Sequence, residues 1–161
     1  MHAATSTGPS PADLPFANDA VRLLAQARGE ADRLGHEYLG TEHLVLAMIR
    51  PPASPSAAVL EGRGVRANQV YRTLAGVLSP GVSALGPDAD RPFTSRTKQA
   101  FALAADSARE LGHARIRSVH ILVGIMREGG NIGAQVLAHH GLTADAAQEG
   151  ARLIVANGDA P

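Results

Sequence analysis

The chain has 161 residues, and its 15 lysine and arginine residues are balanced by 15 aspartate and glutamate residues. This balance argues against nucleic acid as a partner, and the length fits one domain with a packed core. The absence of cysteine excludes disulfides, thiolate catalysis and cysteine-based metal sites. No apolar run approaches the ~18 residues of a membrane span, and residues 1–15 lack the pattern of a signal peptide. We therefore expect a flexible leader at 1–15 of a cytoplasmic protein.

Most of the remaining chain is a tandem repeat. Residues 16–78 align with residues 93–155 at a constant offset of 77 positions and without a gap. Leu34-Gly35-His36 recurs as Leu111-Gly112-His113, and His43-Leu44-Val45-Leu46 recurs as His120-Ile121-Leu122-Val123. A repeat of this length indicates one structural unit that is used twice.

Four helices are predicted in the first copy. Steps of three and four between apolar residues predict a helix over 18–34, whose buried face would hold Val21, Leu24, Ala27 or Arg28, Ala31 and Leu34. A short helix over 41–49 is apolar almost all round, so it should lie buried at the centre, with Thr41 as its capping residue. Pro51, Pro52 and Pro55 predict an extended loop, which is followed by helices over 56–61 and 67–78.

The second copy repeats this pattern, with helices over 95–111, 118–126, 133–140 and 143–155. Thr94 or Ser95 is expected to cap the first of them. A stretch rich in proline and glycine, 81–92, links repeat one (16–80) to repeat two (93–157), and no segment alternates like a strand. The sequence therefore predicts an all-α fold in which two tandem four-helix repeats pack as a pseudo-twofold pair over 16–157.

The segment from His36 to Arg50 resembles the N-terminal repeat domain of the Clp/Hsp100 unfoldases, in particular of the ClpC type. Gly40-Thr41-Glu42-His43 fits the first copy of the family pattern, and Arg127-Glu128-Gly129 and Gln135-Val136-Leu137 fit the second copy. The resemblance extends over nearly everything after residue 15. Family unfoldases continue into ATPase modules, whereas these residues contain no G-x-x-x-x-G-K-[ST] phosphate loop. We therefore expect no enzyme activity.

The resemblance implies a ligand site at the start of the second helix, where the family docks phosphorylated arginine and, nearby, adaptors. Thr41 opens a helix whose free N–H groups can receive a phosphate. Glu42 supplies a carboxylate that can pair with the guanidinium. The alternative is that Thr41 and Glu42 only cap and stabilise the helix.

Repeat two departs from the pattern at the equivalent place. Ser118 and Val119 mark a degenerate second site, because Val119 replaces the acid and Arg117 replaces the glycine. A guanidinium would meet an arginine there instead of a carboxylate. Arg117 could still favour a purely anionic partner, and the alternative is a solvated surface arginine.

The seven histidines raise the question of a metal site. His43 and His120 lie at equivalent positions inside helix starts, and His36 and His113 follow glycines that end helices. This duplicated placement favours a structural role at helix ends, such as satisfying backbone groups. His139-His140 has no acids at ligand spacing, so we expect no metal, no cofactor and no catalytic residue.

Two classes of function follow from these observations. The first is a stand-alone, non-catalytic module of the Clp protease system that binds substrates, adaptors or small ligands as an accessory factor or competitor. The second is the substrate- and adaptor-docking N-terminal domain of an ATP-dependent Clp unfoldase, represented by a fragment. A third, structural reading is a helper that binds the unfoldase itself. We expect a monomer, with neither nucleic acid nor a membrane as partner.

Overall fold

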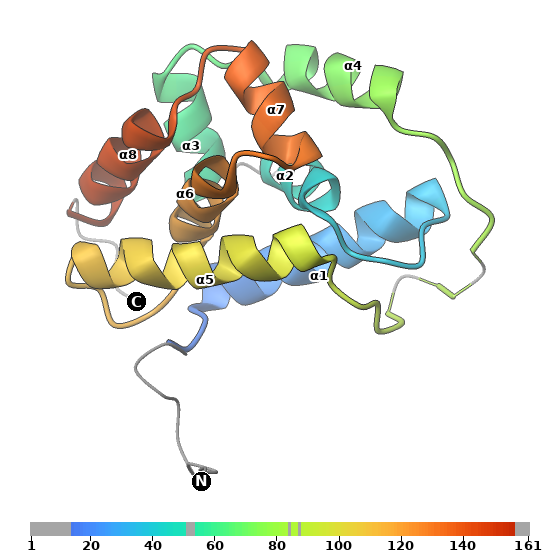
Figure 1. The fold of residues 1–161 in the computed structure, drawn as a ribbon, viewed down its shortest axis with the longest axis horizontal. Coiled ribbons are helices and arrows are strands. Elements are labelled where there is room, and N and C mark those ends of the chain that lie inside the picture. Colours follow the sequence, from blue (N-terminus) through green and yellow to red (C-terminus); the bar gives the residue numbers. More distant parts are fainter. Residues whose placement is uncertain (1–13, 51–53, 84, 87, 157–161) are drawn as a thin grey trace, which may run out of the picture.

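The computed structural model describes residues 14–50, 54–83, 85–86 and 88–156, with side chains as far as residue 154. Within these ranges the chain forms eight α-helices and no strand, which confirms the predicted fold class (Figure 1). The helices are, in chain order, α1 Asn18–Leu34, α2 Thr41–Ile49, α3 Pro55–Gly62, α4 Ala67–Val77, α5 Ser95–Glu110, α6 Ser118–Glu128, α7 Ile132–His139 and α8 Ala144–Ala156.

The helices are arranged in layers. In Figure 1, α1 and α5 run along one side, α2 and α6 lie in the middle, and the remaining four helices cover the other side. The central pair is buried as predicted, since every residue from Thr41 to Met48 and from Ser118 to Met126 is buried. Ile49, which was also expected in the core, is only half-buried at the end of α2.

The two repeats exchange backbone contacts in a reciprocal way. Phe16 of repeat one pairs with Ile116 of repeat two, and Leu39 of repeat one pairs with Phe93 of repeat two. The two pairs interchange under the offset of 77 positions. Likewise, α3 packs on α8 and α4 packs on α7. These exchanges are what a pseudo-twofold arrangement of two four-helix repeats requires.

The buried face of α1 matches the prediction in part. Ala27 and Ala31 are buried as predicted, but Ala20 and Leu23 lie inside the core in place of Val21, which is 52% exposed. The predicted and the observed face both follow helical steps of three and four, so periodicity alone did not separate them. Small alanine side chains on the buried face permit a close approach of α1 to the core, which packing and not periodicity selects.

Two helix starts can be compared with the prediction. Thr94 caps α5 as expected, since its Oγ1 accepts a hydrogen bond from the Thr97 N–H at 3.2 Å. Pro55 was placed in an extended loop but is the first residue of α3, where its fixed φ suits a helix start and Ser54 is the cap. Pro51 and Pro52 lie outside the described residues.

The two repeats are not packed identically. A Cβ atom added at Gly124 of α6 would lie 2.0 Å from the Ala100 carbonyl oxygen of α5, so only glycine permits this close helix contact. The equivalent residue of α2 is Ala47. Accordingly, α5 packs on α6 more extensively than α1 packs on α2. In the described part of the chain, no helix combines the length and apolar character that crossing a membrane requires.

Candidate functional site

The start of α2 is built without a side-chain cap of the usual kind. Its N-cap is Gly40, and Thr41 is the first helical residue rather than the cap that was predicted. The Thr41 hydroxyl instead accepts the Gly133 N–H at 3.1 Å, which joins the start of α2 to α7. The first N–H groups of a helix have no intrahelical acceptor, and they carry the positive end of its dipole. The Thr41 and Glu42 amides are such groups.

Glu42 is held firmly against this helix start. Its side chain is almost fully buried, and its Oε2 accepts a hydrogen bond from the Tyr38 hydroxyl at 3.2 Å. Tyr38 in turn stacks on His36, with ring centroids 5.0 Å apart and ring planes 12° apart. The carboxylate predicted to meet a ligand therefore has a fixed position, and most of its surface faces the protein.

A chain of histidine hydrogen bonds supports the same corner. The Gly40 N–H donates to Nδ1 of His43 at 3.0 Å, so the proton of the neutral His43 ring lies on Nε2. That Nε2 lies 2.8 Å from Nδ1 of His36, and Nε2 of His36 lies 2.7 Å from the carbonyl oxygen of Ser79, which follows α4. Burial, together with the neighbouring His36 ring, lowers the pKa of His43 to about 4.

The start of α6 carries the same histidine arrangement. Nδ1 of His120 accepts the Arg117 N–H at 2.8 Å, and its Nε2 lies 2.9 Å from Nδ1 of His113. Burial and the neighbouring His113 ring lower the pKa of His120 to about 3. The structural role that was predicted for these duplicated histidines, satisfying backbone groups at helix ends, is confirmed.

The two helix starts differ in what approaches them. Asp19 of α1 reaches α6, where its Oδ2 accepts a hydrogen bond from the Ser118 hydroxyl at 2.9 Å. Its two oxygens also lie 3.4 and 3.3 Å from the Ser118 amide nitrogen. Ser118 and Val119, the degenerate second site, are both buried, and Val119 belongs to the core. The second helix start is thus already in contact with a carboxylate of the chain itself.

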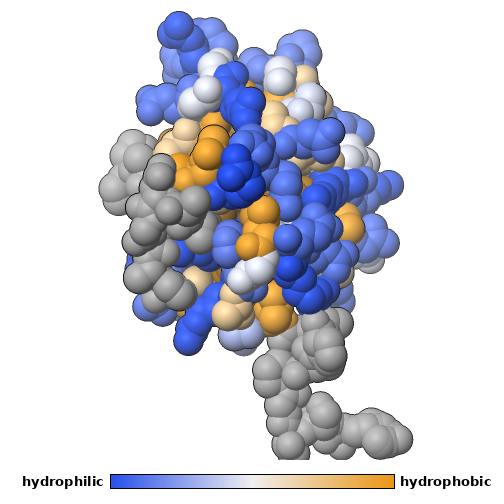
Figure 2. All heavy atoms as spheres, turned by 90° about the vertical axis from the view of Figure 1, so that its left-hand side faces the viewer, coloured by the Kyte–Doolittle hydropathy of each residue, from blue (hydrophilic) through white to orange (hydrophobic). Residues whose placement is uncertain are grey.

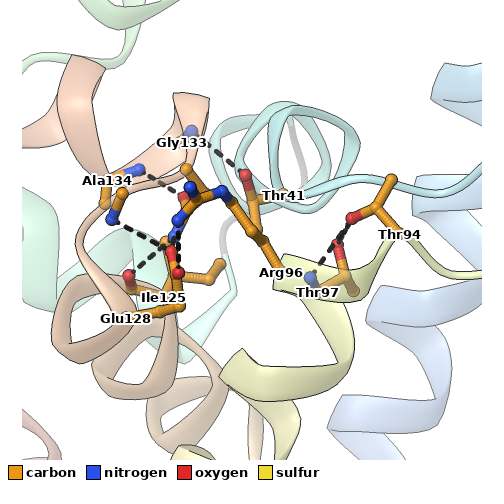
Figure 3. Close-up of polar contacts among 10 residues, drawn as sticks. Thr41, Thr94, Arg96, Thr97, Ile125, Glu128, Gly133 and Ala134 are labelled. Carbon is orange, nitrogen blue, oxygen red and sulfur yellow. Dashed lines mark hydrogen bonds and ion pairs between the residues drawn. The ribbon is translucent and has the colours of Figure 1, made fainter.

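A cation occupies the equivalent position in repeat two. Arg96 of α5 corresponds to Asp19 under the repeat offset, and its side chain is 58% exposed. Its Nη1 donates to Oε2 of Glu128 at 2.6 Å. Asn131 joins this pair to α7, because its Nδ2 donates to Glu128 and its Oδ1 accepts the Ala134 N–H. Figure 3 shows Arg96, Glu128 and Ala134 of this network.

Arg96 and Asp19 were missed by the sequence analysis. The alignment of the two repeats does show that these residues occupy equivalent positions and carry opposite charges. What the alignment could not show is that each lies in the first turn of a helix that reaches toward the other repeat. The Glu128–Asn131 turn that receives Arg96 leads into α7, whose Gly133 amide is bonded to Thr41.

The remaining surface offers other features that bear on a ligand. A hollow of about 680 Å³ lies between α3 and α4 at the far end of α2, lined by Ile49, Leu60 and Val65 among others. On the face shown in Figure 2, apolar side chains reach the surface in several small patches between hydrophilic ones. Across the ranges that the structure describes, no group of three or more His, Asp or Glu side chains could hold a metal ion.

The sequence has clear relatives. Residues 15–140 and 92–159 match the Clp repeat (R) N-terminal domain family. The chaperone protein ClpB of Oceanobacillus iheyensis and the negative regulator of genetic competence ClpC/MecB of Bacillus subtilis are each 32% identical to the chain over 134 residues. The aligned part is 83% of this chain and 16% of either relative, so the chain spans about a sixth of their length.

Solved structures share the fold. The N-terminal domain of ClpD from Arabidopsis thaliana superposes with a TM-score of 0.68 at 24% identity, covering 87% of this chain and 96% of that one. The ClpV N-domain in complex with a VipB peptide superposes with a TM-score of 0.72 at 17% identity, covering 96% of this chain and 98% of that one. At these identities the likeness concerns the fold alone.

Proposed function

Because the chain belongs to the Clp repeat (R) N-terminal domain family, we propose that it is a non-catalytic docking module for protein partners of a Clp unfoldase. Such partners are substrates or adaptors, and the module acts on them as an accessory factor or competitor. A ClpV N-domain of the same fold holds a VipB peptide, which supports the use of this fold for peptide docking.

The docking position that we propose is the start of α2. The observation that carries it is the juxtaposition of two opposite charges in one corner: the positive end of the α2 dipole and the fixed Glu42 carboxylate. A phosphoarginine side chain carries both complementary charges, since its phosphate suits free helix N–H groups and its guanidinium suits a carboxylate. Thr41 and Glu42 are therefore the proposed ligand-binding residues.

Arg96 adds to the charge of this corner. Its exposed guanidinium lies in the network that leads through the start of α7 to Thr41. Glu128 already pairs with this guanidinium, so Arg96 contributes to the attraction for an anionic group only as one half of an ion pair. A partner that carries a phosphate is the class of ligand that this combination favours.

The length of the relatives supports a second candidate. The aligned part is 16% of either bacterial relative, so the second candidate is that the chain is the N-terminal docking domain of an ATP-dependent unfoldase subunit. The two candidates share the site and differ in whether ATPase modules accompany it. The mass of the native protein on an immunoblot distinguishes them.

A calorimetric titration with phosphoarginine, and with a peptide that carries it, tests the proposed site. We expect one bound ligand per chain. Glu42→Gln keeps the size of the side chain and its contact with Tyr38 but removes the charge, so it should weaken binding ~10- to 100-fold, the value of a charged hydrogen bond. Glu37→Gln removes an exposed acid of the same loop and serves as the matched control, with unchanged affinity. Undiminished binding by Glu42→Gln would show that Glu42 only stabilises the helix.

A further inference from the structure

Asp19 and Arg96 hold the same position in the two repeats. Each is the second residue of its helix, α1 or α5. The pseudo-twofold arrangement directs the start of α1 toward the start of α6, and the start of α5 toward the turn between α6 and α7, which leads to the Gly133 amide bonded to Thr41. The repeat has therefore placed an anion at one helix start and a cation near the other.

The contact of Asp19 with α6 has the form of a bound anion. Its carboxylate receives a hydrogen bond from the Ser118 hydroxyl at 2.9 Å and lies within 3.4 Å of the Ser118 amide nitrogen. A helix start attracts such a group through its free N–H groups and its dipole. Ser118 itself is fully buried, so without Asp19 its hydroxyl and amide would lose an acceptor that they need.

At the start of α2 no carboxylate from the other repeat takes this place, and the carboxylate beside the N-cap residue Gly40 is that of Glu42 in the same helix. The Thr41 hydroxyl is engaged with the Gly133 amide, and the hydrogen bonds of the described residues include no side-chain acceptor for the Thr41 or Glu42 amide. The residue that corresponds to Asp19 is Arg96, and its guanidinium is directed to Glu128. The first helix start thus lacks the acidic partner from the other repeat that the second one has.

We propose that Asp19 is an internal occupant of the second docking position, which closes the start of α6 to external anions and leaves the module with one docking position, at α2. The statement that one docking position remains rests on the docking function proposed above. The closure of the α6 start by Asp19 can be measured without it. A tethered carboxylate has a high effective concentration at its site, so a free anion at millimolar concentration competes with it poorly. Asp19 is then the residue that determines how many partner groups one chain can hold.

Inorganic phosphate is a suitable probe, because it needs no carboxylate from the protein. In a titration of the full chain followed by proton–nitrogen NMR, the amide signals of Thr41 and Glu42 should shift, and those of Ser118 and Val119 should stay unchanged. In Asp19→Ala, the Ser118 and Val119 amides should respond as well, with an apparent affinity at least ~10-fold tighter than in the parent chain. Asp19→Ser serves if Asp19→Ala does not fold, since serine is too short to reach Ser118.

Arg96→Ala is the matched control, because it changes the equivalent residue of the other repeat. It should weaken the response at Thr41 and leave Ser118 unresponsive. The proposal is overturned if Ser118 responds equally in the parent chain, or if it stays silent in folded Asp19→Ala and Asp19→Ser. A response of Ser118 in Asp19→Ala without any response at Thr41 and Glu42 would support the closure by Asp19 and contradict the proposed α2 site.

Discussion

His43 and His120 hold their helix starts through nitrogens that carry no proton. Each accepts a backbone N–H at Nδ1, and each directs Nε2 toward a second histidine. A proton added at Nδ1 would set a donor against a backbone donor, inside a core that contains little to solvate a charge. The two rings therefore act as neutral structural groups, although histidine is usually a candidate for chemistry.

Acid should destabilise the protein through these two residues. The unfolded chain protonates them near pH 6.5, but the folded chain does so only near pH 4 for His43 and pH 3 for His120. Their contribution to stability is complete above about pH 7 and falls as the pH drops from 6.5 toward 4, by about 2 kcal/mol per histidine between pH 7 and pH 5. Urea unfolding at both pH values measures this loss.

His43→Asn isolates one of the two contributions. Asparagine can still accept the Gly40 N–H but does not titrate, so the difference between pH 7 and pH 5 should shrink by about 2 kcal/mol. His120→Asn should behave in the same way. An unchanged pH dependence in both variants would contradict the assignment.

At this scale the sequence was informative where the contacts are local. The Gly-Thr-Glu-His motif and the helix start it marks lie within four residues, so the place of Thr41 and Glu42 at the start of α2 and the structural role of His43 could be predicted. Thr41 was wrongly taken as the cap, since the His43 ring serves the helix start instead. Asp19 meets Ser118 across 99 positions of the chain, and no local pattern reports a contact of that kind.

At the scale of the helices, the two repeats differ in packing because of one glycine. The contact between α5 and α6 depends on the absence of a side chain at Gly124, whereas the equivalent residue of α2 is Ala47. Helix positions could be predicted to within about two residues from periodicity and capping signals. Which face of α1 is buried could not be predicted in full, because Val21 and Ala20 are neighbours on the helix surface and only packing selects between them.

Gly124→Ala should destabilise the protein by ~1–3 kcal/mol, the range for an overpacked core, because the new methyl group would meet the Ala100 carbonyl oxygen. Gly76→Ala in α4 is the matched control. Nothing lies within 4 Å of a Cβ atom there, so the change should stabilise the helix by ~0.4–1 kcal/mol. Denaturant unfolding of both variants gives the comparison, and a stable Gly124→Ala would show that α5 can move away without cost.

At the scale of the whole molecule, the reciprocal contacts make the two repeats one folding unit. The pairs Phe16–Ile116 and Leu39–Phe93 cross between them, and a single core cluster contains residues of both. Domains of this size usually unfold in one cooperative step when their cores are shared. The repeats should not melt separately.

Leu46→Ala tests this cooperativity. It removes a buried side chain of α2 and should cost ~2–5 kcal/mol. Both tyrosines, Tyr38 and Tyr71, lie in repeat one, and the chain contains no tryptophan, so tyrosine fluorescence reports on that repeat alone. Circular dichroism reports on both repeats. The two signals should shift together, and a helical signal that survives the loss of tyrosine fluorescence would refute the single unit.

The starts of the two central helices each make a hydrogen bond to the other half of the chain: Ser118 of α6 to Asp19, and Thr41 of α2 to Gly133. Two identical single-repeat chains could make the same exchanges as a homodimer, but then any substitution would appear at both ends at once, as symmetry of an isologous interface demands. Joining the halves covalently removes that constraint. An acid can then stand where its counterpart is arginine, as Asp19 and Arg96 do here, so that the two equivalent surfaces differ in charge. Two covalently joined repeats can therefore carry different residues on equivalent surfaces, as the subunits of a heterodimer do, without the assembly of two different subunits.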